Sequence, residues 1–162
     1  MWTAPQLSET LSKAELYSSL ASQVRALLEG EPDTIAKMAN CAALLFHALP
    51  EVNWVGFYRL QGNELVLGPF QGRPACVRIP IGRGVCGTAA EQRMTLRVAN
   101  VEEFAGHIAC DTASKSEVVV PLASPAGTVI GVLDIDSPRL GRFDAEDEAG
   151  LEKLAAIIAQ QL

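Results

Sequence analysis

Four cysteines are the residues of this sequence best suited to redox chemistry: Cys41, Cys76, Cys86 and Cys110. None of them forms a Cys-x-x-Cys pair, and the chain has two histidines. The spacing therefore lacks the paired ligands of a structural zinc site. The pattern predicts core thiols or thiol chemistry, and we expect neither a metal site nor another cofactor.

The local sequence separates these cysteines. Cys41 lies within an amphipathic helical pattern and is expected to be a buried core thiol. Cys86 follows two glycines at the expected start of a helix, where backbone N–H groups and the helix dipole favour a thiolate. Cys76 stands at the start of an expected strand, and Cys110 in a segment without periodicity, where thiols are often accessible. For these last three, a structural role is the alternative to a chemical one.

Three acidic residues fall at the ends of two expected neighbouring strands. Strict alternation places Asp134 and Asp136 on one face of a strand, together with Ile130 and Val132, and Glu117 begins the strand beside it. Carboxylates in such a position are costly unless they are paired, and they raise one another's pKa. Either these strand ends are solvated, or the acids bind a cationic ligand or donate a proton.

Aromatic and glycine residues offer two further patterns. Trp54 and Tyr58 share a face of one expected strand, where they pack in the core or line a pocket for a methyl or ammonium group. Gly82, Gly84 and Gly87 match the dinucleotide-binding pattern G-x-G-x-x-G. The pattern lacks β-α-β surroundings, so we interpret it as a tight turn that presents Cys86.

Length and charge exclude several classes of protein. With 162 residues, 49% of them hydrophobic, the chain is expected to form a single domain spanning 1–162. Thirteen Lys and Arg against 19 Asp and Glu give a net charge of −6, which argues against binding to nucleic acid or to anionic membranes. No apolar run reaches the ~18 residues of a membrane span, and residues 1–12 do not resemble a signal peptide. We expect a cytoplasmic protein.

Capping and periodicity predict the elements that position these residues. Ser12 and Glu15 form a capping box before one helix, and Asp33 and Asp144 are expected N-caps of two more. Expected strands are 54–60, 64–70, 76–79, 95–98, 117–123 and 129–135, with a short helix after Gly84 and a long loop over 99–116. This order predicts an α+β fold. A central antiparallel sheet would carry the terminal helices on one face and a ligand pocket under the short helix and the loop on the other.

Four blocks of the sequence resemble the free-methionine-(R)-sulfoxide reductases, which are GAF-domain enzymes. The blocks are Asn53-Trp54-Val55-Gly56-Phe57-Tyr58, Gly84-Val85-Cys86-Gly87, His107-Ile108-Ala109-Cys110-Asp111 and Gly131-Val132-Leu133-Asp134-Ile135-Asp136-Ser137. The resemblance covers essentially the whole chain and implies a GAF-like single domain. It also implies reduction of the R-sulfoxide of free methionine through a cysteine sulfenic acid and an intramolecular disulfide, recycled by thioredoxin.

The resemblance also implies roles for particular residues. Cys110 would attack the sulfoxide, Cys76 would resolve the product as a disulfide, and Cys86 would be an accessory thiol. The residues themselves leave open whether Cys86 or Cys110 attacks first. Glu117, Asp134 and Asp136 would hold the ammonium group and the protonated sulfoxide, while Trp54 and Tyr58 would line the pocket for the methyl group. Loop backbone N–H groups would bind the substrate carboxylate.

Two other classes share parts of this pattern. A GAF module that senses a small molecule or a redox state would use the same fold and acids without catalysis, but it has no need of three reactive cysteines. A protein resembling a thiol peroxidase would need no amino-acid pocket. The sequence leaves a homodimer open.

Overall fold

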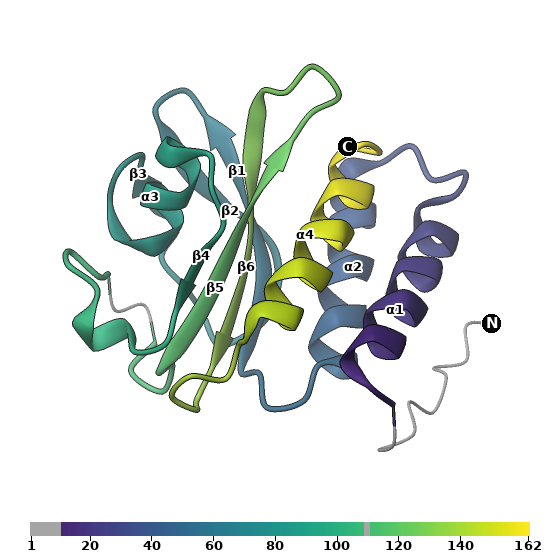
Figure 1. Ribbon diagram of the computed structural model, residues 1–162. Coiled ribbons are helices and arrows are strands. Elements are labelled where there is room, and N and C mark those ends of the chain that lie inside the picture. The colour runs from purple at the N-terminus through teal and green to yellow at the C-terminus, as the bar shows by residue number, and fades with distance from the viewer. Residues whose placement is uncertain (1–10, 109–110) are drawn as a thin grey trace.

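The computed structural model describes residues 11–108 and 111–162. Its elements are α1 (Lys13–Leu28), α2 (Thr34–Ala48), β1 (Trp54–Gln61), β2 (Glu64–Gly72), β3 (Arg78–Pro80), α3 (Gly84–Gln92), β4 (Leu96–Val98), a 3₁₀ turn (Val101–Glu103), β5 (Ser116–Ala123), β6 (Val129–Ser137) and α4 (Ala145–Ala159). Helices α1, α2 and α4 lie on one side of the sheet, and α3 lies on the other (Figure 1).

The helices begin at the residues that the sequence predicts. The Ser12 hydroxyl accepts a hydrogen bond from the Glu15 backbone, and the Glu15 carboxylate accepts one from the Ser12 backbone. Asp33 caps α2 by accepting from the Ala36 backbone, and Asp144 caps α4. These caps satisfy backbone N–H groups that have no partner within the helix.

The six strands form one antiparallel sheet in the order β3-β2-β1-β6-β5-β4. Strands β1 and β6 are central and are covered on both faces. Val55, Phe57 and Leu133 point into the core with α1, α2 and α4, whereas Trp54 and Tyr58 point toward α3. The expected α+β architecture is therefore confirmed.

Two details of the sheet differ from the sequence predictions. Strand β3 begins at Arg78 instead of Cys76. The Cys76 carbonyl accepts a hydrogen bond of 2.9 Å from the Tyr58 hydroxyl and not from the backbone of a neighbouring strand. Strict alternation predicts Ile130 on the face of Asp134 and Asp136, but it packs against the core on the helical side. The pairing of β5 with β6 shifts in register between Leu122 and Ala123. This irregularity breaks the strict alternation of side chains near the start of β6.

Backbone hydrogen bonds hold the described part of the predicted long loop. Val101 donates to the Lys115 carbonyl at 2.9 Å, and Gly141 donates to the Ala99 carbonyl at 2.8 Å. The loop also contains the short 3₁₀ turn, which hydrophobic periodicity could not indicate. It is thereby held beside the end of the sheet where β5 begins.

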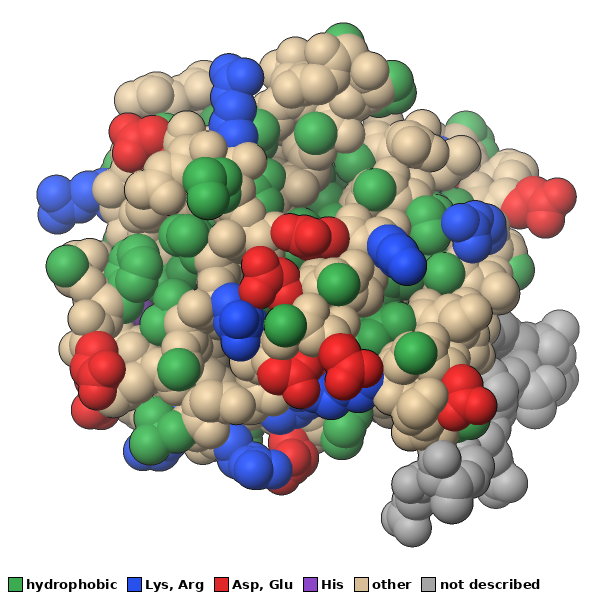
Figure 2. Space-filling model, viewed as in Figure 1, with side chains coloured by type: hydrophobic (Ala, Val, Ile, Leu, Met, Phe, Trp, Pro, Cys, Tyr) green, Lys and Arg blue, Asp and Glu red, His purple; other side chains and the backbone are tan. Residues whose placement is uncertain are grey.

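The surface mixes charges of both signs. Acidic and basic side chains are interspersed on the face shown in Figure 2, and an ion pair between Arg97 and Glu148 joins β4 to α4 at 2.8 Å. Within the described part of the chain, no helix combines the length and the apolar character that a membrane span requires.

Candidate active site

Strand register gathers the three predicted acids on the face of the sheet toward α3. Asp136 of β6 pairs with Trp54 of β1 on one side and with Glu117 of β5 on the other. Two residues along β6, Asp134 pairs with Gly56 and lies on the same face. Residues far apart in the sequence therefore meet at one end of the sheet.

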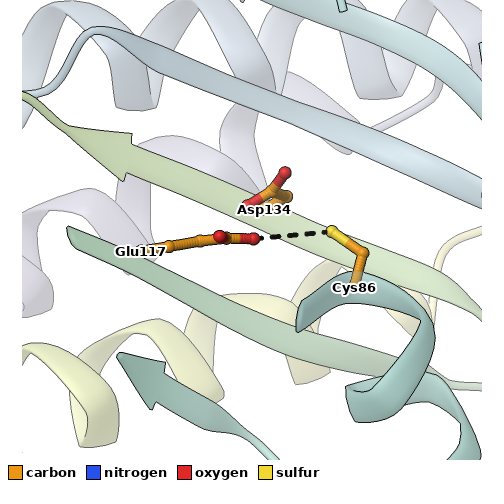
Figure 3. Close-up of side chains that lie close together, drawn as sticks. All are labelled: Cys86, Glu117 and Asp134. Atoms are coloured by element: carbon orange, nitrogen blue, oxygen red, sulfur yellow. Dashed lines mark hydrogen bonds between the residues drawn. The ribbon is translucent and has the colours of Figure 1, made fainter. Parts of the chain in front are cut away.

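Helix α3 adds a thiol to these acids. A Cβ atom at Gly87 would lie 2.4 Å from the Pro80 carbonyl oxygen, so glycine lets the first turn of α3 pack directly against the end of β3. This turn points Cys86 at the acids, with its Sγ 3.8 Å from Glu117 Oε1 (Figure 3). We call the hollow lined by Cys86, Glu117, Asp134, Asp136 and Trp54 the acidic pocket.

Burial makes the acids of the acidic pocket weaker. Loss of solvation raises the pKa of Asp134 to about 6. It also raises the pKa of Glu117 and Asp136 well above their ordinary values, and the neighbouring Asp134 charge adds to both shifts. Burial thus keeps protons available inside the acidic pocket, where an acid catalyst could deliver one.

The same surroundings overturn the prediction that Cys86 is a ready thiolate. Burial and the charges of Asp134 and Glu117 raise the pKa of the Cys86 thiol well above its ordinary value. These effects outweigh the helix N-terminus, whose partial positive charge is small and fixed. Cys86 is therefore a protonated thiol beside carboxyl groups.

An aromatic wall closes one side of the acidic pocket. The rings of Trp54 and Tyr58 stack with their centroids 5.9 Å apart, and Phe70 stacks on Trp54 at 5.3 Å. The Trp54 indole N–H donates to the Arg73 carbonyl at 3.1 Å, which fixes the ring. The sequence does not predict Phe70 here, because it comes from β2 and meets Trp54 only through the register of the sheet.

The acidic pocket has further lining residues to which the sequence analysis assigned no role. They are Pro74, Ala75, Ile79, Gly84, Val85, His107, Ile108, Asp111 and Ser114. Several come from the loop after the 3₁₀ turn. Its polar residues His107, Asp111 and Ser114 were the feature of the sequence that could have indicated a place in the pocket. Of the described residues that line the pocket, none is Lys or Arg. The pocket is partly open, with a cavity volume of about 40 Å³.

The cysteines occupy three different environments. Cys41 is buried in α2 on the opposite side of the sheet, as predicted, and burial raises its pKa to about 12. Cys76 lies next to β3 and is part of a disulfide. Cys110, the predicted attacking thiol, lies outside the described residues.

Comparison with known proteins identifies the class to which this fold belongs. A family model described as GAF domain matches residues 17–162, and the chain belongs to the GAF domain family. Within that family, relatives named free methionine-R-sulfoxide reductase that are 43–55% identical over at least 90% of this chain place it in that group.

Three relatives illustrate the match. The free methionine-R-sulfoxide reductase of Escherichia coli is 51% identical over 94% of this chain and 92% of its own. The reduced form of fRMsr from Staphylococcus aureus is 55% identical with a TM-score of 0.87, over 90% of this chain and 94% of that one. The Neisseria meningitidis free methionine-R-sulfoxide reductase, solved in complex with its substrate, is 43% identical with a TM-score of 0.91, over 98% and 95% of the two chains.

Proposed function

We propose that this chain reduces free methionine R-sulfoxide to methionine, using two of its own thiols for each turnover. The observation that carries the proposal is the acidic pocket itself. In a member of this enzyme family, it places three carboxyl groups of raised pKa against an aromatic wall. Its described lining includes no Lys or Arg, so a positively charged ligand group is the natural partner of these acids.

Substrate recognition follows from this lining. The ammonium group of a free amino acid would neutralise the carboxylates of Asp136 and Glu117. The methyl group on the substrate sulfur would pack against Trp54 and Tyr58.

The chemistry begins with attack by the Cys110 thiolate on the sulfoxide sulfur. The sulfur–oxygen bond breaks more readily when the oxygen receives a proton, which Glu117 or Asp134 would supply. The protonated oxygen moves to the Cys110 sulfur as the transient bond between the two sulfurs breaks, so methionine leaves and Cys110 becomes a sulfenic acid. The Cys76 thiol then displaces that oxygen as water and forms a disulfide. The disulfide seen at Cys76 supports this redox role. A dithiol protein such as thioredoxin would reduce the disulfide by exchange.

An assay with purified components tests the proposal. The chain is mixed with thioredoxin, thioredoxin reductase, NADPH and either the R or the S epimer of free methionine sulfoxide. We expect one methionine per NADPH from the R epimer and none from the S epimer. The Cys41→Ser variant should be fully active, because Cys41 lies in the helical layer away from the pocket. Tight binding of the R epimer without methionine formation would contradict the proposal and favour a sensory GAF module.

A further inference from the structure

Three metal-binding atoms converge at the floor of the acidic pocket. The Sγ of Cys86 and one carboxyl oxygen each of Glu117 and Asp134 all lie within 4.8 Å of one another. They come from α3, β5 and β6, and their side chains point toward a common centre (Figure 3). All three residues are buried, with exposed fractions of 4%, 6% and 6%.

An unpartnered oxygen points to a missing ligand. Asp134 Oδ1 is buried and has no hydrogen-bond partner among the described residues. A buried carboxyl oxygen that has lost its water and gained no partner destabilises the fold. The described lining offers no Lys or Arg that could supply this partner.

The geometry suits a compact cation. Zinc–sulfur and zinc–oxygen bonds of about 2.3 and 2.1 Å at a tetrahedral angle place the two ligand atoms about 3.6 Å apart. Cys86 Sγ and Glu117 Oε1 are 3.8 Å apart. The cavity volume of about 40 Å³ leaves room for an ion with a bound water.

We propose that the acidic pocket is also a binding site for a thiophilic divalent cation such as Zn²⁺, with Cys86, Glu117 and Asp134 as its ligands. One thiolate and two carboxylates form a mixed set that zinc accepts, and water from the pocket completes a four-coordinate site. The ion would block the reductase, a part of the inference that rests on the proposed function, because Glu117 would bind both the ion and the substrate ammonium group.

Cobalt(II) serves as the probe, because a thiolate bound to it gives a charge-transfer band in the near ultraviolet. The reduced chain is titrated with Co²⁺ under anaerobic conditions, without substrate. We expect a band that saturates at one Co²⁺ per chain and disappears when Zn²⁺ is added. Cys86→Ser should abolish the band, and Asp134→Asn should weaken Co²⁺ binding at least about tenfold.

Matched thiol variants decide where the ion binds. Cys41→Ser removes a buried thiol from the opposite side of the sheet, and Cys76→Ser removes one next to β3. Both should retain the band. A band that survives Cys86→Ser, or that is lost in Cys76→Ser, overturns the proposal, as does the absence of any band in a chain shown to be folded by circular dichroism.

Inhibition is measured separately from binding. In the reductase assay, Zn²⁺ should raise KM for methionine sulfoxide without changing kcat, and chelation should reverse the effect. A cobalt band in a chain without reductase activity would contradict the proposed function and leave the metal site standing. An active chain that gives no band would contradict the metal site alone. Inhibition that lowers kcat at saturating substrate would contradict competition at this site.

Discussion

Glu117 and Asp136 are direct cross-strand partners on β5 and β6, and both side chains lie on the face toward α3. Like charges facing each other across a sheet are destabilising, and burial adds to the cost of ionisation. The fold therefore favours protonated acids here until a cation arrives. The same feature suits a pocket that must hold an ammonium group and also protonate a leaving oxygen.

This arrangement predicts a pH-dependent cost of folding. The pKa of Asp134 rises from 3.8 to about 6 on folding, so the folded state holds a proton that the unfolded state has released. The free energy of unfolding should therefore fall as pH rises from about 4 through 6, by up to about 3 kcal/mol for this group. Asp134→Asn should remove this loss. In urea denaturation, the free energy of unfolding of the variant relative to that of the parent should be higher at pH 7.5 than at pH 4.5.

A control variant on the far side of the sheet isolates the pocket. Tyr17→Phe removes a buried hydrogen bond of 2.9 Å to Asp147 and should cost about 1–2 kcal/mol at both pH values. An Asp134→Asn variant whose stability relative to the parent did not change between the two pH values would refute the assignment of a raised pKa.

Much of the fold could be predicted from local signals. The caps at Ser12, Asp33 and Asp144 and the periodicity that follows them determine the helices. The alternation in β6 placed Asp134 and Asp136 on one face correctly. It failed at Ile130, because a register shift depends on the partner strand and leaves no mark in the periodicity.

The electrostatics of the site could not be predicted in the same way. The helix start at Gly84 suggested a low pKa for Cys86, but the opposing effect comes from burial and from acids far away in the sequence. The cluster of cation-binding atoms escaped prediction for the same reason. Its members Cys86, Glu117 and Asp134 have no regular spacing, and only the tertiary fold brings them together.

The order of the thiol steps gives a second prediction. Cys110→Ser should form no methionine even in a single turnover, because the attacking atom is gone. Cys76→Ser should release about one methionine per chain and then stop as a sulfenic acid, because resolution follows the chemical step. Quenched single-turnover assays and mass spectrometry measure both outcomes. A normal single-turnover yield from Cys110→Ser would transfer the attacking role to Cys86.

The cysteine pairing is a separate prediction. After one turnover without reductant, peptide mapping should find a disulfide between Cys76 and Cys110. Their Cα atoms would then lie within ~7 Å, as a disulfide requires. A link between Cys86 and Cys110 in its place would show that Cys76 is not the resolving thiol.

Selection for the free amino acid follows from the acids of the acidic pocket. An N-acetylated methionine sulfoxide offers a neutral amide where the free substrate offers an ammonium group. Leaving the carboxylates of Asp136 and Glu117 without a cation should lower kcat/KM at least about tenfold. The Asp136→Asn variant should lose this preference mainly through a higher KM for the free substrate. Equal kcat/KM for the two substrates in the parent chain would show that the acids do not select the ammonium group.

The position of Trp54 depends on the absence of a side chain at Gly56. A Cβ atom there would lie 2.4 Å from both the Trp54 ring and the Phe70 Cβ atom, so Gly56→Ala must displace the aromatic wall. Overpacking of this kind costs about 1–3 kcal/mol of stability. The misplaced ring should raise KM for methionine sulfoxide by about tenfold, which is the loss of about 1.4 kcal/mol of binding.

Gly127→Ala is the matched control. Gly127 adopts a φ of +82° in the β5–β6 turn, and a Cβ atom added there would meet no described atom within 4 Å. It should destabilise the chain by about 1–2 kcal/mol through backbone strain and leave KM unchanged. If Gly56→Ala loses stability but keeps the KM of the parent, the aromatic wall does not bind the substrate.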